Sequence, residues 1–284
     1  MAIETPGGNT TLIYDEIASN IVTGPLVQAS TFLSAPGLRI VNASHEMRFP
    51  KVGAITAGYV AAGAQVSDGD AAFTEVRVLP SGIKGTKALI KLSAELIRTA
   101  GVDLESVIRE QMVDGIARAV DAALWNGDGN APTDDEVLGI LARDSVEAGD
   151  LDLTDADSII DGIAKAVGNK VQPNALAMNI DTFTAFRKLK VGASDARYIF
   201  DPSNAYRANS FEMFGLPVII TDNVPAESVA VIDFTKIVVV RDQAPTVSVD
   251  KLIEYDSTAM LVTTRLDVGL LHDEAVTLLT VPEE

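Results

Sequence analysis

The sequence predicts an α+β protein that works by assembling, and three observations carry this prediction. The stretch from Leu92 to Leu141 holds a long amphipathic pattern that ends in a glycine-rich corner and contains no catalytic constellation. Residues 150–232 alternate helix and strand signals, and the residues after 232 show strand signals only. One rod, one compact lobe and a set of strands are parts of a structural protein rather than of an enzyme.

The first 90 residues predict two extensions that lack a core of their own. Residues 1–40 are irregular, and prolines break them, so they indicate an extended arm with a short helical piece. Two strand-like runs follow, at Met47–Val52 and Phe73–Pro80, separated by a segment rich in Gly, Ala and Ser. The pattern is that of a long hairpin with its tip near residues 67–70. Because an isolated two-stranded ribbon is only marginally stable, we expect the hairpin to need a partner surface.

A long helix follows the hairpin. Its apolar positions recur every three or four residues: Leu104, Ile108, Met112, Ile116, Val120 and Leu124. The opposite, solvent-facing side is expected to carry Arg109, Glu110, Asp114, Arg118 and Asp121. Asp103 suits the N-cap position, and Gly127 is placed to end the helix.

The second half of the chain predicts a lobe and then strands. In the lobe we expect helices over 154–167 and 181–189, with strands at 174–179, 216–221 and 228–233. Four further strands are expected at 236–241, 246–254, 260–267 and 275–281.

Several short motifs occur in a fixed order along these elements. They are Ser93-x-Glu95-Leu96, the corner Gly127-Asp128-Gly129…Pro132…Gly139-Ile140-Leu141, Met178-Asn179-x-x-Thr182-Phe183, Gly215-x-Pro217-Val218, and Arg265-Leu266-Asp267 followed by Ala275. In this order and spacing, the chain from about residue 40 to 281 resembles the major capsid proteins of tailed bacteriophages that share the Hong Kong 97-like fold.

The resemblance implies an architecture and a function. It implies an N-terminal arm (1–44), an extended loop (45–88), a peripheral domain with a spine helix (89–145), an axial domain (146–232) and strands returning to the peripheral domain (233–284). Pentamers and hexamers of the chain would form an icosahedral head around double-stranded DNA that is enclosed without sequence-specific binding. The implied partners are a portal, a separate scaffolding protein and a cement or decoration protein. The protein would be made in the host bacterial cytoplasm and end in the virion.

The composition narrows the alternatives. The chain has no cysteine, no signal-peptide pattern at its start, and no apolar run of the length a membrane helix requires. Its formal charge of −18 disfavours nucleic-acid binding, and acidic residues are concentrated between Asp134 and Asp161. That segment fits a solvated face, or a docking surface for a basic partner or cations. As part of a shell, an acidic inner wall would let packaged DNA slide.

Few residues could carry chemistry. The two histidine sites, His45-Glu46 and His272-Asp273-Glu274, are far apart in sequence and lack a third partner. The run Asn126-x-Asp128-x-Asn130 starts like a calcium loop, but Ala131 and Val137 stand where Gly and Glu are needed. We therefore predict no catalytic residue, no metal site and no cofactor.

Two departures from the capsid relatives are expected. Met1 stands close to the arm, which leaves no room for a cleaved scaffolding segment. Some members join a loop lysine to an asparagine of the peripheral domain. Lys51 and Lys84 could be loop lysines, yet no asparagine lies between Val224 and Glu284, so we predict that this cross-link is absent.

Two points stay open. The glycines at positions 53, 58, 63, 82 and 85 are either hinges that adjust the loop or residues of simple turns. The alternatives to a phage capsid protein are an encapsulin-like compartment shell, which shares the fold, and a soluble α+β enzyme that uses the acidic segment as a metal site.

Overall fold

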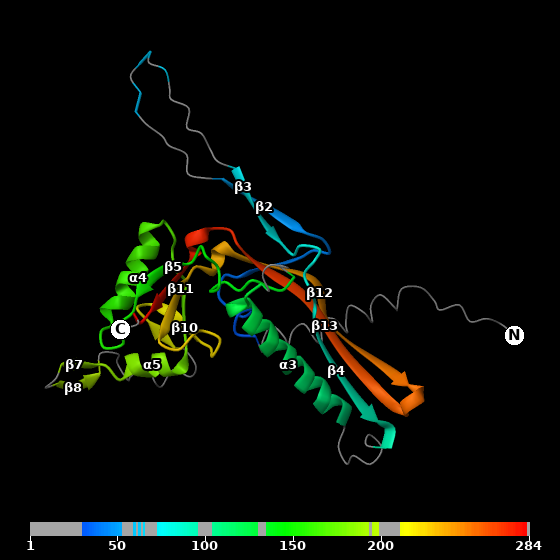
Figure 1. Ribbon diagram of the computed structural model, residues 1–284. Coiled ribbons are helices and arrows are strands. Elements are labelled where there is room, and N and C mark those ends of the chain that lie inside the picture. The colour runs from blue at the N-terminus through cyan, green and yellow to red at the C-terminus, as the bar shows by residue number, and fades with distance from the viewer. Residues whose placement is uncertain are drawn as a thin grey trace.

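The protein is an α+β molecule with two sheets and a projecting hairpin (Figure 1). The computed structural model describes residues 30–52, 59–60, 62–63, 65, 73–95, 104–129, 135–192, 195–198 and 211–282. The four-stranded sheet has the order β1 (Arg39–Asn42), β12 (Ile237–Leu252), β13 (Ser257–Leu270), β4 (Thr86–Ser93). The six-stranded sheet has the order β5 (Glu147–Asp150), β14 (Val276–Thr280), β11 (Ser228–Ile232), β6 (Ala175–Met178), β10 (Leu216–Ile220), β9 (Glu212–Met213).

Two more strand pairs and three α-helices complete the described fold. The pairs are β2 (Met47–Val52) with β3 (Phe73–Val78), and β7 (Lys190–Gly192) with β8 (Asp195–Tyr198). The helices are α3 (Leu104–Asn126), α4 (Asp157–Gly168) and α5 (Ile180–Arg187), and the 3-10 turns are η2 (Phe234–Lys236), η3 (Ile253–Tyr255) and η4 (Asp273–Ala275). No helix in the described part of the chain is long and apolar enough to cross a membrane.

Helix α3 covers one face of the four-stranded sheet, as its apolar stripe predicts. Met112, Ile116 and Leu124 are buried in one core cluster with residues of β12 and β13. The centre of this cluster is aromatic: Trp125 lies 5.1 Å from Phe32 and 6.2 Å from Phe234, edge to face. The helix is therefore fixed to the sheet along most of its length rather than at one end.

The prediction for Asp121 was wrong. This carboxylate is 5% exposed and accepts hydrogen bonds from Thr31, from the backbone N–H at 2.7 Å and the hydroxyl at 2.9 Å, and another from the Ser30 hydroxyl. Its neighbours one turn away on α3, Ala117 and Trp125, are also buried. Asp121 therefore belongs to the core side of the helix, where it fixes the chain that enters the fold.

The described end of the predicted arm is likewise part of the fold. Phe32 is fully buried in the core, and β1 pairs in parallel with β12. Residues 30–42 thus differ from the expectation of an irregular, extended segment. Residues 1–29, including the predicted helical piece, lie outside the described residues.

The corner after α3 is built by two glycines in contact. The N–H groups of Ile140 and Leu141 bond to the carbonyls of Leu124 and Trp125 at 2.9 and 3.0 Å, so the returning chain caps the C-terminus of the helix. A Cβ atom at Gly139 would lie 2.5 Å from the backbone nitrogen of Gly127. Only glycine permits this approach, which accounts for the spacing of the glycine motif.

The lobe forms around the six-stranded sheet as expected from its alternating signals. Ile159 of α4 and Phe183 and Phe186 of α5 are buried against β6 and β11. β14 departs from the prediction, because it pairs with β11 and with β5 instead of joining the four-stranded sheet. The last strand of the chain therefore completes the lobe, which the prediction had ended at residue 232.

β12 is one long strand where two were predicted. Its pairing with β13 shifts register between Arg241 and Thr246, around Pro245. A bulge accommodates proline, which has no N–H to donate to the ladder, without ending the strand. β12 and β13 extend from the body beside α3, away from the lobe and the hairpin (Figure 1).

Candidate assembly surfaces and the base of the hairpin

The β2–β3 hairpin has one face toward the body and one toward solvent. Met47, Phe49 and Val76 project inward and pack with Val238 and Val240 of β12 in a separate apolar cluster. In the core α3 packs on the other side of the four-stranded sheet. The base of the hairpin is thus held by packing, and β2 and β3 lead away from the body (Figure 1).

The outer face of the hairpin carries a network of four charges. Arg48 lies directly opposite Arg77 across the two strands. Each of these arginines lies close to both Glu46 and Glu75. Arg77 pairs with Glu75 at 2.6 Å and Arg48 with Glu46 at 2.9 Å, and the hydrogen bond to Glu75 raises the pKa of Arg77. Phe73 stands at the far end of the described strand, 77% exposed.

A buried carboxyl, that of Asp267, lies where the hairpin rejoins the body. Asp267 of β13 accepts the N–H of Leu79 at 2.7 Å and of Val268 at 2.8 Å. Arg143 lies nearby and donates to the carbonyls of Leu138 and Val268 at 3.1 and 2.6 Å. Burial raises the pKa of Asp267, and it lowers the pKa of Arg143. Leu79 has a φ of +61°, so its hydrogen bond to Asp267 holds a backbone conformation that is unfavourable for leucine.

Three sets of exposed apolar side chains outside the hairpin are candidates for contact with other chains. Ile253 and Tyr255 form the tip of β12–β13, where Ile253 is 92% exposed. Leu89 and Leu261 lie side by side on β4 and β13, on the sheet face opposite α3. The third set belongs to the lobe and consists of Ile180, Tyr198, Phe211 and Phe214.

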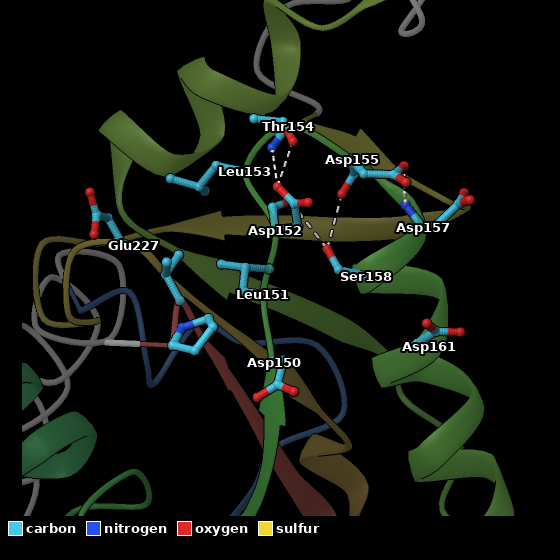
Figure 2. A pocket seen from close by; sticks show the side chains of 12 residues that line it. Asp150, Leu151, Asp152, Leu153, Thr154, Asp155, Asp157, Ser158, Asp161 and Glu227 are labelled. Carbon is cyan, nitrogen blue, oxygen red and sulfur yellow. Dashed lines mark hydrogen bonds between the residues drawn. The ribbon is translucent and has the colours of Figure 1, made fainter. Parts of the chain in front are cut away.

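The acidic segment lines a groove between β5 and α4 (Figure 2). The lining carboxylates are Asp150, Asp152, Asp155, Asp157, Asp161 and Glu227. Asp152 accepts hydrogen bonds from the hydroxyl and N–H of Thr154, both at 2.7 Å, and these bonds lower the pKa of Asp152. Within the described residues, no three His, Asp or Glu side chains come together in a way that could hold a metal ion.

The other residues singled out in the sequence fall at separate places. His272 lies 2.8 Å from Glu274 beside η4, whereas His45 precedes β2. Asp128 forms an isolated backbone bridge with Leu138, which places it in the glycine corner. Asn130 and Ala131 of the candidate calcium loop lie outside the described residues.

Both candidate cross-linking lysines are paired with carboxylates of their own chain. Lys51 forms an ion pair with Asp273, and Lys84 lies 2.7 Å from Asp135. The hydrogen bond to Asp135 raises the pKa of Lys84. No local sequence pattern indicates these partners, because each is distant along the chain.

A helix-backed sheet, a projecting hairpin and a separate mixed lobe define a shell-forming protein with the Hong Kong 97-like capsid fold, and comparisons with known proteins agree. The capsid of an empty GTA particle matches with a TM-score of 0.71 at 21% identity, over 90% of each chain. A chain of Mycobacterium phage Adephagia matches with a TM-score of 0.68 at 17% identity, over 90% of this chain and 91% of that one. A chain of Microbacterium phage Oxtober96 gives 0.70 at 16% identity, over 89% and 91%.

The sequence itself gives the family. Residues 9–281 match the model of the phage capsid family, although no curated protein matches the chain. The chain belongs to the phage capsid family. It is therefore a structural component of a virion capsid and not an enzyme.

Proposed function

We propose that this protein is the major capsid protein of a tailed phage, that it assembles into pentamers and hexamers, and that these close an icosahedral head around double-stranded DNA. The observation that carries the proposal is the hairpin, whose outer face bears Phe73 at 77% exposure above a network of charges. A large aromatic side chain so placed gains most by being covered by another chain.

The proposed function assigns a separate role to each segment of the chain. We propose an N-terminal arm over residues 1–44, an extended loop over 45–88, and a peripheral domain that joins 89–145 to 233–275. The axial domain is 146–232 together with β14, since β14 pairs with β11 and β5. The exposed apolar side chains of the lobe would then meet their counterparts at the centre of each pentamer or hexamer.

Several weak contacts for each subunit suffice for such a shell. Each copy gives its hairpin to one neighbour and receives a hairpin from another, and a ring of such contacts closes on itself. The tip of β12–β13, with Ile253, lies far from the hairpin and is available for contacts between rings (Figure 1). Because one subunit makes these contacts simultaneously, its overall affinity for the shell is much higher than that of any single contact.

The remaining partners follow from the capsid role. We propose a portal, a separate scaffolding protein and a cement protein as partners, and assembly in the host bacterial cytoplasm. The DNA is enclosed without specific binding, in keeping with a net charge of −18 that repels phosphates. The acidic groove between β5 and α4 would line the inner wall, and a shell with this groove on its outside would refute that placement.

The proposal is tested by changing Phe73 to Ser and following assembly. Because Phe73 is exposed in the single chain, we expect the free energy of unfolding to change by less than about 0.5 kcal/mol. The yield of closed particles, measured by sedimentation and electron microscopy, should fall severalfold. Val167→Ser on α4, at 54% exposure, likewise replaces an exposed apolar side chain with serine and serves as the control.

The outcomes are distinct. Icosahedral particles from the unchanged protein, lost in Phe73→Ser and kept in Val167→Ser, support the proposal. Unchanged protein that stays monomeric, with or without the other head proteins of its phage, contradicts it. Particles that form without portal and never contain DNA would instead favour a compartment shell.

A further inference from the structure

Three alternate residues of β13 contact the hairpin where it rejoins the body. Side chains of a strand alternate between its two faces, so every second residue belongs to the same face. One face of β13 therefore includes Arg265, Asp267 and Gly269. Each of them contacts the return strand β3 or the turn that follows it, and each contact is of a different kind.

Arg265 holds the turn. Its Nε donates to the carbonyl of Ile83 at 3.0 Å, and its Nη2 donates to the carbonyls of Pro80 and Ser81 at 3.0 and 3.2 Å. Its Nη1 pairs with Asp242 of β12 at 2.9 Å, which fixes the guanidinium on the sheet. One planar group thus ties three carbonyls of this turn to the sheet.

Asp267 and Gly269 hold the end of the hairpin strand. Asp267 accepts the N–H of Leu79, the residue with positive φ at which the chain bends out of β3. At Gly269 a Cβ atom would lie 2.4 Å from Cγ2 of Val78, so the strand can lie on the sheet at this height only because residue 269 has no side chain. Residues of β13 therefore determine both the direction in which β3 ends and the distance between β3 and the sheet.

The turn beyond these contacts is also held. A Cβ atom at Gly85 would lie 3.1 Å from the carbonyl oxygen of Thr264, and Lys84 donates its N–H to the carbonyl of Asp135 at 2.7 Å. Gly85 therefore serves close packing rather than a hinge. On the entering strand, the ion pair of Lys51 with Asp273 is the matching contact with the body.

We infer that Arg265, Asp267 and Gly269 are positioning residues that set the direction in which the hairpin leaves its subunit and, through it, the curvature and diameter of the shell. The inference rests on the proposed function, since it requires the hairpin to lie on a neighbouring copy. Phe73 stands about 17 Å along the strand from Val78, so a tilt of about 10° at the base moves it by about 3 Å. Packed interfaces do not absorb such a shift.

A purely structural role would predict something different. In that case, loss of a contact would lower the stability of the subunit without changing the geometry of the shells that do form. The test must therefore separate stability, read by thermal unfolding, from geometry, read as particle diameter in electron micrographs.

Four variants make this separation. Asp267→Asn places an amide NH₂ against one of the two N–H donors, and Gly269→Ala pushes Val78 away from the sheet. Val78→Ala combined with Gly269→Ala removes that collision while it deletes buried methyl groups. Asp233→Asn is the matched control, because Asp233 is 3% exposed and its carboxylate accepts the N–H of Thr235 at 3.0 Å within its own turn.

We expect shells of one diameter from the unchanged protein and from Asp233→Asn. Asp267→Asn and Gly269→Ala should yield mostly shells of another diameter or open sheets, and the double variant should recover the original diameter although its melting temperature is lower. Original diameters in both single variants, or a double variant no better than Gly269→Ala, would overturn the inference. If Asp267→Asn does not fold, the Gly269 pair decides the question alone. Failure of the unchanged protein to form shells would instead overturn the proposed function.

Discussion

At the scale of single residues, the buried carboxylate of Asp121 ties helix α3 to the chain that enters the fold, because it accepts hydrogen bonds from Ser30 and Thr31. A helical pattern assigns polar residues to solvent, and Asp121 is polar. The signal that points the other way is its spacing: Ala117 and Trp125, four residues to either side, are both apolar and both buried. Its partners Ser30 and Thr31 are about ninety residues away in the chain, and no local pattern reveals them.

Replacing Asp121 should destabilise the subunit. In Asp121→Ala the N–H and hydroxyl of Thr31 lose their acceptor, and the free energy of unfolding should fall by roughly 2 kcal/mol in urea titration. Glu110→Ala, at an exposed position of the same helix, should change it by less than about 0.5 kcal/mol. Equal effects of the two changes would show that Asp121 faces solvent after all.

Two glycines of the same region should respond to alanine with opposite signs. At Gly139 the new Cβ would collide with the backbone of Gly127, which should cost roughly 1–3 kcal/mol. Gly115 lies within α3 with no atom near its would-be Cβ, so Gly115→Ala should stabilise by about 0.5–1 kcal/mol. Thermal unfolding of both variants checks the pair, and a stabilising Gly139→Ala would contradict the described corner.

The buried carboxyl of Asp267 gives a prediction about pH. Burial raises its pKa in the folded state above the ordinary value of 3.8, although the N–H groups of Leu79 and Val268 and the charge of Arg143 lower it in part. The folded state then keeps this proton to higher pH than the unfolded state. Its contribution to stability is complete below the ordinary pKa and is lost as pH rises through the raised pKa.

Comparison with Asp267→Asn isolates this effect. Other carboxyls cancel in the difference between the two proteins, so the advantage in unfolding free energy of the original protein over the variant should decrease as pH rises from acid toward neutral. Urea titration at several pH values measures it. An advantage that grows with pH would mean that the pKa of Asp267 is lowered by its partners.

At the scale of elements, the strength of the local pattern decided what could be predicted. The periodicity of α3 and the alternation of β2 and β3 located these elements correctly. β4 was missed although Lys87, Leu89 and Lys91 alternate outward along it, because short half-exposed strands resemble loops. β5 reads Glu-Ala-Gly-Asp and contains no strand signal, since its pairing with β14 alone makes it a strand.

The order of the strands in each sheet could not be predicted from the sequence, because it depends on pairing between distant segments. β14 follows β13 closely in the chain but lies in the other sheet, between β5 and β11.

The candidate surfaces were predicted in part. The projecting hairpin was predicted because its segment cannot form a core of its own. The contacts at its base were not predicted, because they join β3 to a strand nearly two hundred residues later.

At the scale of the whole molecule, the separation of hairpin, sheet and lobe places exposed apolar groups at three distant ends (Figure 1). A subunit of this form contacts several neighbours at once without large movement of its core. The cross-link that some relatives make remains predicted absent, and the ion pairs of Lys51 and Lys84 within the chain agree with this.

Electrophoresis of mature particles in denaturant, without reductant, checks the absence of cross-links. Because the chain has no cysteine, any covalent oligomer would have to come from another bond. We expect a single band at the mass of the monomer. A ladder of oligomers would contradict the prediction.

We propose that the hairpin of each copy lies on the next copy in a closed shell. Cryo-electron microscopy of assembled particles, at a resolution that shows side chains, can observe this contact. We expect rings of five and six subunits in which Phe73 is covered by a neighbouring chain. Particles in which Phe73 stays exposed, or in which the hairpin folds back on its own subunit, would contradict it.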